Sequence, residues 1–196
     1  MNATVALKNK QQDAVNAYIG MTIIIGAFCM FFGSLFVSYL VLRLRQAQWP
    51  PPGYPAFPSG TGLSLVSTIV LLVSSLFLHI GIKRLDASNN QGFKTFLGLG
   101  IITGFLFLGL QVLLWKEVNS LGIYMNSGAV GAIFYGLTLI HAAHIVAGLI
   151  ALLILLPGAF SGAYLEKGST RVRLTVVFWH FLDIMWIIIY LGIFVF

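Results

Sequence analysis

The sequence predicts an all-α integral membrane protein built as a bundle of five transmembrane helices. Hydrophobic residues make up 59% of its 196 residues and charged residues only 8%, whereas a soluble domain carries about 25% charged residues. The apolar residues are gathered into five long runs, and most charged residues lie between them. Such a chain would expose apolar surface on every side in water, so its solvent is the bilayer.

The first span is predicted at residues 18–42, after an N-terminal segment, residues 1–17, that we expect in the cytoplasm. Its apolar run lies between Asp13 and Arg43. The run is too long for the apolar region of a signal peptide, and no small-residue cleavage site follows it. We therefore expect a retained membrane helix.

Four further apolar runs predict spans at residues 63–82, 95–115, 129–156 and 174–196. Each is long enough to cross about 30 Å of hydrocarbon at about 1.5 Å per residue. The runs do not alternate polar and apolar residues as barrel strands do, so they are helices. The fourth span is expected to stop before Pro157 because proline lacks the backbone N–H that continues a helix.

The basic residues predict the orientation. Three of the 11 Lys and Arg residues (Arg43, Arg45 and Lys116) lie on one side of the predicted topology. The other eight are Lys8, Lys10, Lys83, Arg84, Lys94, Lys167, Arg171 and Arg173. The positive-inside rule places the N-terminus in the cytoplasm and the C-terminus outside, which an odd number of spans allows.

The net charge of +6 does not indicate a nucleic-acid partner, because the basic residues sit at helix ends. Cys29 is the only cysteine, so neither an intrachain disulfide nor a cysteine-based metal site is expected.

The loop between the first two spans is rich in proline, which makes it extended and rigid. It is a candidate docking surface for a partner on the outer face, and a plain rigid connector is the alternative. The candidate docking residues are Trp49, Pro50, Pro51, Pro52 and Gly53.

Ionisable side chains inside a membrane are costly and are therefore candidates for function. The spans contain His79, His141, His144, His180 and Asp183. Two histidines three residues apart on one helix, His141 and His144, cannot clamp a single haem between them. His79 lies too near a helix end to pair with His141, whereas His180 stays open as a partner. Interhelical hydrogen bonding or lipid contact is the favoured interpretation, and we expect no haem or metal in this chain.

Asp183 lies about 14 Å into the last span. A carboxylate at that depth needs a hydrogen-bonding or ionic partner, and His144 lies at a comparable depth on the fourth span. We expect an Asp183–histidine contact that supports helix packing. A proton relay is the alternative, but no second carboxylate lies within a span.

Small residues line the third and fourth spans and predict close helix packing. On the third span they are Gly98, Gly100, Gly104 and Gly109. On the fourth they are Gly128, Ala129, Gly131, Ala132, Gly136, Ala142, Ala143, Ala147 and Gly148.

Each predicted span carries a recognisable motif. In chain order these are Met30-Phe31-Phe32-Gly33 with the following Trp49-Pro50-Pro51-Pro52-Gly53, Leu71-Leu72-Val73-Ser74-Ser75 with His79, Phe107-Leu108-Gly109 with Gln111, His141-Ala142-Ala143-His144, and Phe178-Trp179-His180-Phe181-Leu182-Asp183-Ile184-Met185-Trp186. With these five motifs in order, the chain resembles subunit III of the haem–copper respiratory oxidases in its short five-helix bacterial form.

The resemblance implies a non-catalytic accessory subunit of the bacterial cytoplasmic membrane. It would pack directly on subunit I, which holds the haem and copper, and would join subunit II, subunit IV and a respiratory supercomplex. Phospholipid would lie in its grooves. By this resemblance His141, His144, His180 and Asp183 are lipid-contact or packing positions. We count His79, Trp179 and Trp186 as further candidates for the same role.

This chain departs from the family at Phe28 and Leu114, where many members carry glutamate, so the roles of those carboxylates do not transfer. A subunit of a quinol oxidase or of a nitric oxide reductase is the alternative within the family. Outside it, the alternatives are a b-haem electron carrier and a stand-alone transporter. The lack of an internal repeat counts against the transporter.

Overall fold

The computed structural model describes residues 2–48, 51–52, 62–167 and 169–195, and within these ranges the regular elements are helical. The elements are α1 (Asn2–Leu44), α2 (Leu63–Asp86), α3 (Asn90–Ser120), α4 (Ala129–Phe160), α5 (Ala163–Lys167), α6 (Thr170–Tyr190) and the π-helical turn η1 (Leu191–Val195). Within the described ranges, five helices are long and apolar enough to cross a membrane, which confirms the predicted helix count and type.

The first helix is longer than predicted. The expected N-terminal segment, residues 1–17, is helical from Asn2 onward and continuous with the first span, because α1 runs without interruption from Asn2 to Leu44. No proline or glycine occurs between Asn2 and Ala17, so nothing in the backbone stops the helix before the apolar run begins.

Helix α4 also continues past Pro157, where the apolar run was expected to stop, and ends at Phe160; the limits of the membrane span itself stay a prediction. Proline removes a hydrogen bond to the turn before it but can itself hold helical φ. The Ser161 N–H donates to the Pro157 carbonyl at 3.1 Å, and Asn90 Nδ2 donates to the Ala159 carbonyl at 3.0 Å. These bonds close the last turn.

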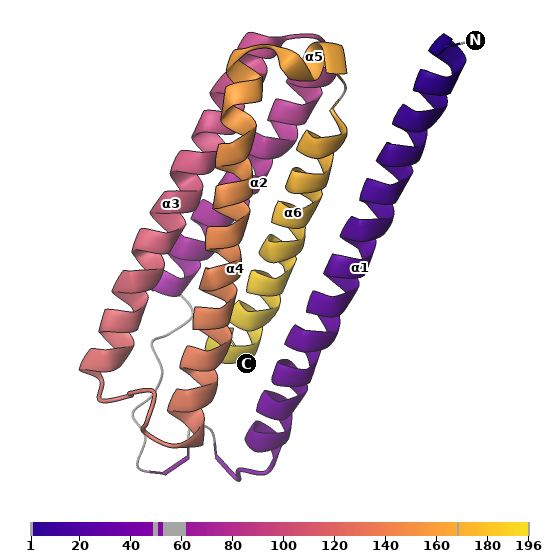
Figure 1. The fold of residues 1–196 in the computed structure, drawn as a ribbon. Coiled ribbons are helices and arrows are strands. Elements are labelled where there is room, and N and C mark those ends of the chain that lie inside the picture. Colours follow the sequence, from indigo (N-terminus) through magenta and orange to yellow (C-terminus); the bar gives the residue numbers. More distant parts are fainter. Residues whose placement is uncertain (1, 49–50, 53–61, 168, 196) are drawn as a thin grey trace.

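Four long helices, α2, α3, α4 and α6, pack into a bundle, and α1 lies at its flank (Figure 1). Helix α1 contacts α6 and α4, and among its described side chains only Phe32 and Tyr39 are buried. Between Tyr18 and Leu44, α1 therefore presents an apolar surface that lipid or another subunit must cover.

A three-residue turn, Ala87–Asn89, joins α2 to α3 and makes them antiparallel neighbours. Ser88 adopts φ +57°, and the Asn89 side chain accepts from the Gly92 N–H at 2.8 Å. This cap satisfies one of the free N–H groups at the start of α3.

The helix ends that carry most of the basic residues lie at the same end of the bundle, as the charge pattern predicted. The N-terminus, the α2–α3 turn and α5 lie at one end of the bundle, and the C-terminus lies toward the other (Figure 1). At the first end, Arg173 forms an ion pair with Asp86, and the Lys94 ammonium lies 5.6 Å from the Phe160 ring centroid. The side of the membrane that this basic end faces stays a prediction.

Close packing depends on some of the predicted small residues only. A Cβ atom added at Gly100 would lie 2.6 Å from Leu78 Cδ2, and one at Gly104 would lie 2.9 Å from Trp179 Cη2. At Gly98 and Gly109 nothing lies within 4 Å, so the prediction was wrong for these two. They face away from the neighbouring helices, a distinction that composition does not reveal.

On α4 the same division holds. A Cβ atom at Gly148 would lie 3.1 Å from Trp179 Cε3, whereas nothing lies within 4 Å of one at Gly136. Gly104 and Gly148 thus both pack against the Trp179 indole, and Gly131 of α4 lies against the backbone carbonyl of Tyr124.

Candidate functional site

The predicted site residues lie in three places: the core of the four-helix bundle, the boundary between α2 and α6, and a groove between α1 and α4. His141 and Trp186 meet in the core. Their rings stack with centroids 5.2 Å apart and planes 30° apart. The Trp186 indole N–H donates to Thr68 Oγ1 at 2.9 Å, and the Phe107 ring stands edge-on to both rings. Residues of α2, α3, α4 and α6 thus pack together around the Trp186 ring.

His144 points to α1 instead of the core. Its ring lies edge-on to Phe28 with centroids 4.5 Å apart and lies 5.3 Å from the Phe32 ring. Its Nδ1–H donates to the Ile140 carbonyl at 2.7 Å. The suggested pairing of His144 with Asp183 is therefore wrong, because comparable depth on two helices does not mean facing sides.

Asp183 instead contacts a histidine of its own helix. His180 Nδ1 lies 3.6 Å from Asp183 Oδ2, because residues three apart on a helix share a face. The Ser75 hydroxyl on α2 is hydrogen-bonded to the same Nδ1 atom. Asp183 is 4% exposed, and its neighbour His180 is only partly buried. The predicted Asp–His contact exists, with a different histidine.

His79 lies one turn from Ser75 on α2, and its ring centroid is 6.2 Å from that of His180. Its side chain is exposed. His79 and His180 therefore lie at the outer edge of the α2–α6 boundary, with Asp183 beneath them. Sequence spacing alone does not predict this grouping, since the two histidines come from different helices.

Trp179 is fully buried and packs over Gly104 of α3 and Gly148 of α4. The large side chain on α6 thus fits against small residues on two helices, the arrangement by which helices associate in lipid. Trp179 acts as a packing residue in this structure.

The described ranges contain no group of three or more His, Cys, Asp or Glu residues that could hold a metal ion. His141 faces Trp186 and His144 faces Phe28, so the two do not present their nitrogens to one point. The expectation that this chain carries no haem or metal stays a prediction.

An apolar groove of about 500 Å³ lies between α1 and α4. Its lining residues are Ala27, Phe28, Phe31, Ile140, Ala143 and His144. The histidine is the only titratable side chain among them, and its Nδ1–H is already bonded within α4. The groove suits a hydrocarbon chain better than a polar substrate.

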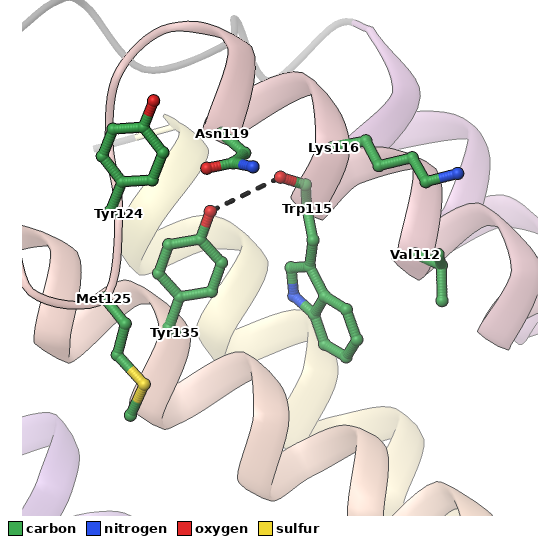
Figure 2. Close-up of a pocket in the computed structure, with 7 residues that line it drawn as sticks. All are labelled: Val112, Trp115, Lys116, Asn119, Tyr124, Met125 and Tyr135. Carbon is green, nitrogen blue, oxygen red and sulfur yellow. Dashed lines mark hydrogen bonds between the residues drawn. The ribbon is translucent and has the colours of Figure 1, made fainter.

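A second pocket, of about 340 Å³, is lined by residues from the end of α3, the start of α4 and the loop between them (Figure 2). The Tyr135 hydroxyl donates to the Ile123 carbonyl at 3.0 Å, and it lies 3.4 Å from the backbone carbonyl oxygen of Trp115. The Lys116 side chain extends away from Tyr124 and Met125 (Figure 2). The Asn119 amide lies beside the bond between Tyr135 and Trp115 (Figure 2).

Sequence reasoning missed a contact that holds α1 to the bundle. The Tyr39 hydroxyl donates to the Gly192 carbonyl in η1 at 2.5 Å, and Arg43 Nη1 lies 2.7 Å from that hydroxyl and 3.1 Å from the same carbonyl. Carbonyls in the last turn of a helix have no intrahelical partner and can accept hydrogen bonds from side chains. In the sequence, only the spacing of Tyr39 and Arg43, which are one helical turn apart, could have indicated this contact.

Most of the candidate docking loop cannot be placed, because Trp49, Pro50 and Gly53 lie outside the described residues. Of the two prolines between them, Pro51 is partly buried and Pro52 is exposed. Its docking role stays a prediction.

Comparisons with known proteins agree with the sequence motifs. The family model described as cytochrome c oxidase subunit III matches residues 5–196. Cytochrome c oxidase subunit 3 of Thermostichus vulcanus is 28% identical over 177 residues, covering 88% of this chain and 83% of that protein. The protein of the same name from Bacillus subtilis strain 168 is 28% identical over 180 residues, covering 91% and 85%. A probable cytochrome c oxidase subunit 3 of Mycobacterium tuberculosis strain H37Rv is 27% identical over 179 residues, covering 90% and 86%.

Proposed function

Since the chain belongs to the cytochrome c oxidase subunit III family, we propose that it is the non-catalytic accessory subunit of a proton-translocating terminal oxidase. Its partner subunit I would hold the haem and copper and reduce oxygen to water. The observation that supports a non-catalytic role is that the intramembrane histidines contact neighbouring protein groups. His141 stacks on Trp186, His144 bonds within its own helix and His180 bonds to Ser75.

Association with other oxidase subunits follows from the family. We propose direct packing on subunit I, with subunit II, subunit IV and a supercomplex as further partners. The apolar surface of α1 supports such packing, because residues such as Met30 (79% exposed) and Ile23 (66% exposed) need an apolar neighbour. Pro51 and Pro52 lie next to this helix in the chain and would extend the contact outside the membrane.

The test of this function is a mild-detergent pull-down of the tagged chain, with mass spectrometry and an absorption spectrum. Recovery of oxidase subunits I and II, with haem in proportion to subunit I, supports the proposal. The copurifying catalytic subunit also separates a cytochrome c oxidase from a quinol oxidase or a nitric oxide reductase. A Soret band from the chain alone would indicate a b-haem carrier, and solute uptake by the chain alone in proteoliposomes would indicate a transporter.

We also propose that the α1–α4 groove holds a phospholipid acyl chain. Its lining is apolar apart from His144, and its volume is about 500 Å³. Ala143→Phe would fill part of the groove and lower the amount of lipid that copurifies, measured by native mass spectrometry. Ala147→Phe is the matched control, because Ala147 is exposed one turn further along α4 and does not line the groove. Equal lipid content in both variants would contradict the proposal.

The bacterial cytoplasmic membrane is the proposed location, with the basic end of the bundle in the cytoplasm. The supporting observation is that eight of the 11 Lys and Arg residues belong to that end. Reporter fusions after Asp86 and after Phe196 test the orientation. We expect a cytoplasmic signal from the first and an external signal from the second.

A further inference from the structure

Polar side chains of α2 and α6 form a ladder along the boundary between these two antiparallel helices. At the basic end of the bundle, Asp86 of α2 is ion-paired with Arg173 of α6. His79 lies seven positions before Asp86 and His180 seven positions after Arg173, and their ring centroids are 6.2 Å apart. Ser75, one turn deeper on α2, is hydrogen-bonded to His180 Nδ1. The two helices therefore keep one register along the ladder.

The two imidazole rings lie deeper than the ion pair. Seven residues of an α-helix are about 10 Å long, so both rings lie about 10 Å further along the bundle than Asp86 and Arg173. Both histidines also fall inside predicted spans, residues 63–82 and 174–196. The acyl chains that surround a protein at that depth offer no hydrogen-bonding atom.

Both rings are open to the surroundings of the bundle. The His79 side chain is exposed, and 35% of the His180 side chain is exposed. His180 uses Nδ1 for its contacts with Ser75 and Asp183. Within the described residues, His180 Nε2 and both ring nitrogens of His79 have no hydrogen-bond partner. Ionisable side chains inside a membrane almost always face protein or a water-filled cavity, so another polar group must cover these rings.

The surface around the two rings is apolar. Leu76 lies three positions before His79, and Val177 and Ile184 lie three before and four after His180. At these spacings each side chain shares a helix face with its histidine. All three are between 45% and 57% exposed. A polar group within an apolar surface is typical of places where membrane helices associate, whereas a water-filled cavity would need polar walls.

From the ladder and its apolar surroundings we propose that the α2–α6 polar face, made of Leu76, His79, Val177, His180 and Ile184, binds a transmembrane helix of a partner oxidase subunit. That helix carries a hydroxyl or carboxyl side chain at the depth of the two rings, because such groups can bond to an imidazole nitrogen whether it donates or accepts. The inference rests on the proposed function, which supplies the partner subunits.

Photo-crosslinking in the assembled complex tests this face. The photoreactive residue p-benzoylphenylalanine replaces Leu76, and in a control complex it replaces Ile102 of α3, which is 65% exposed. We expect a crosslink from position 76 to a transmembrane segment of a partner subunit that carries an oxygen-bearing side chain, and a much lower yield from position 102. A lipid adduct alone at position 76, or equal yields at both positions, would overturn the proposal. If the subunits still copurify in that case, the proposed function stands and only this face is wrong.

The retention of His79 variants gives a second test. If lipid covered the face, leucine would be at least as favourable there as histidine. If a partner helix covers it, His79→Leu removes a bond between helices and should lower the ratio of this chain to subunit I after detergent washes by about threefold. His79→Gln keeps a hydrogen-bonding side chain and should restore part of the loss. Ile102→Leu is the matched control and should change nothing. Unchanged or increased retention of His79→Leu would contradict a polar contact between subunits.

Discussion

The Tyr39 hydroxyl on α1 is bonded to the Gly192 carbonyl in η1, a contact between residues 153 positions apart. Arg43, one turn further along α1, reaches the same carbonyl and the same hydroxyl. Because α1 buries few of its side chains, we expect this polar contact to contribute to its attachment at that end.

Tyr39→Phe should therefore loosen α1 without unfolding the four-helix bundle. Loss of a hydrogen bond next to a charged group costs about 1.5–3 kcal/mol, and α1 has little other burial to offset it. Faster hydrogen exchange in the C-terminal half of α1, with unchanged exchange in α3, is the expected readout. Tyr18→Phe is the control, because Tyr18 is 45% exposed on the same helix. Equal exchange in both variants would show that the contact is dispensable.

Gly104→Ala should destabilise the bundle, because the new methyl group would lie 2.9 Å from Trp179 Cη2 and 2.8 Å from Leu149 Cδ2. Overpacking of this kind costs about 1–3 kcal/mol. Gly109→Ala, on the same helix with nothing within 4 Å, should be neutral or slightly stabilising. Thermal denaturation of the purified complex compares the two. A Gly104 variant as stable as the Gly109 variant would mean that Trp179 moves aside freely.

Replacing His141 and His144 together by leucine should leave the haem spectrum of the complex unchanged when it is scaled to subunit I content. The reason is geometric: one ring stacks on Trp186 and the other lies against Phe28. The double variant can lower stability, since His141 is fully buried. Disappearance of a haem signal from otherwise intact complex would contradict a cofactor-free subunit.

Asp183→Asn should leave the initial rate of oxygen reduction largely intact but weaken retention of this subunit during purification. Asparagine keeps the size of the side chain but removes the acidic partner of His180, 3.6 Å away. Retention is measured as the ratio of this chain to subunit I after repeated detergent washes.

Asp86→Asn is the control for Asp183→Asn. Asp86 pairs with Arg173 at the surface, with both side chains more than 40% exposed, and such pairs contribute about 0–1 kcal/mol. It should not affect retention. Full assembly with no oxygen reduction in Asp183→Asn would instead point to a proton-transfer role for this carboxyl.

The fold class was predictable because membrane helices are specified locally. Runs of apolar residues long enough to cross hydrocarbon, ended by charged residues, need no knowledge of their neighbours. Their ends were less predictable: α1 extends back to Asn2 and α4 passes Pro157, because helices continue beyond hydrocarbon until the backbone or a cap stops them.

The sequence by itself determined that this is a five-helix membrane protein, which residues could be buried polar groups, and the family to which its motifs belong. Only the tertiary structure decided that Asp183 pairs with His180 and not His144, that Gly104 packs while Gly109 does not, and that Tyr39 reaches Gly192. The physical reason is rotation: each helix can turn about its axis without changing its apolar content, and only the packing of all the helices fixes which sides face one another.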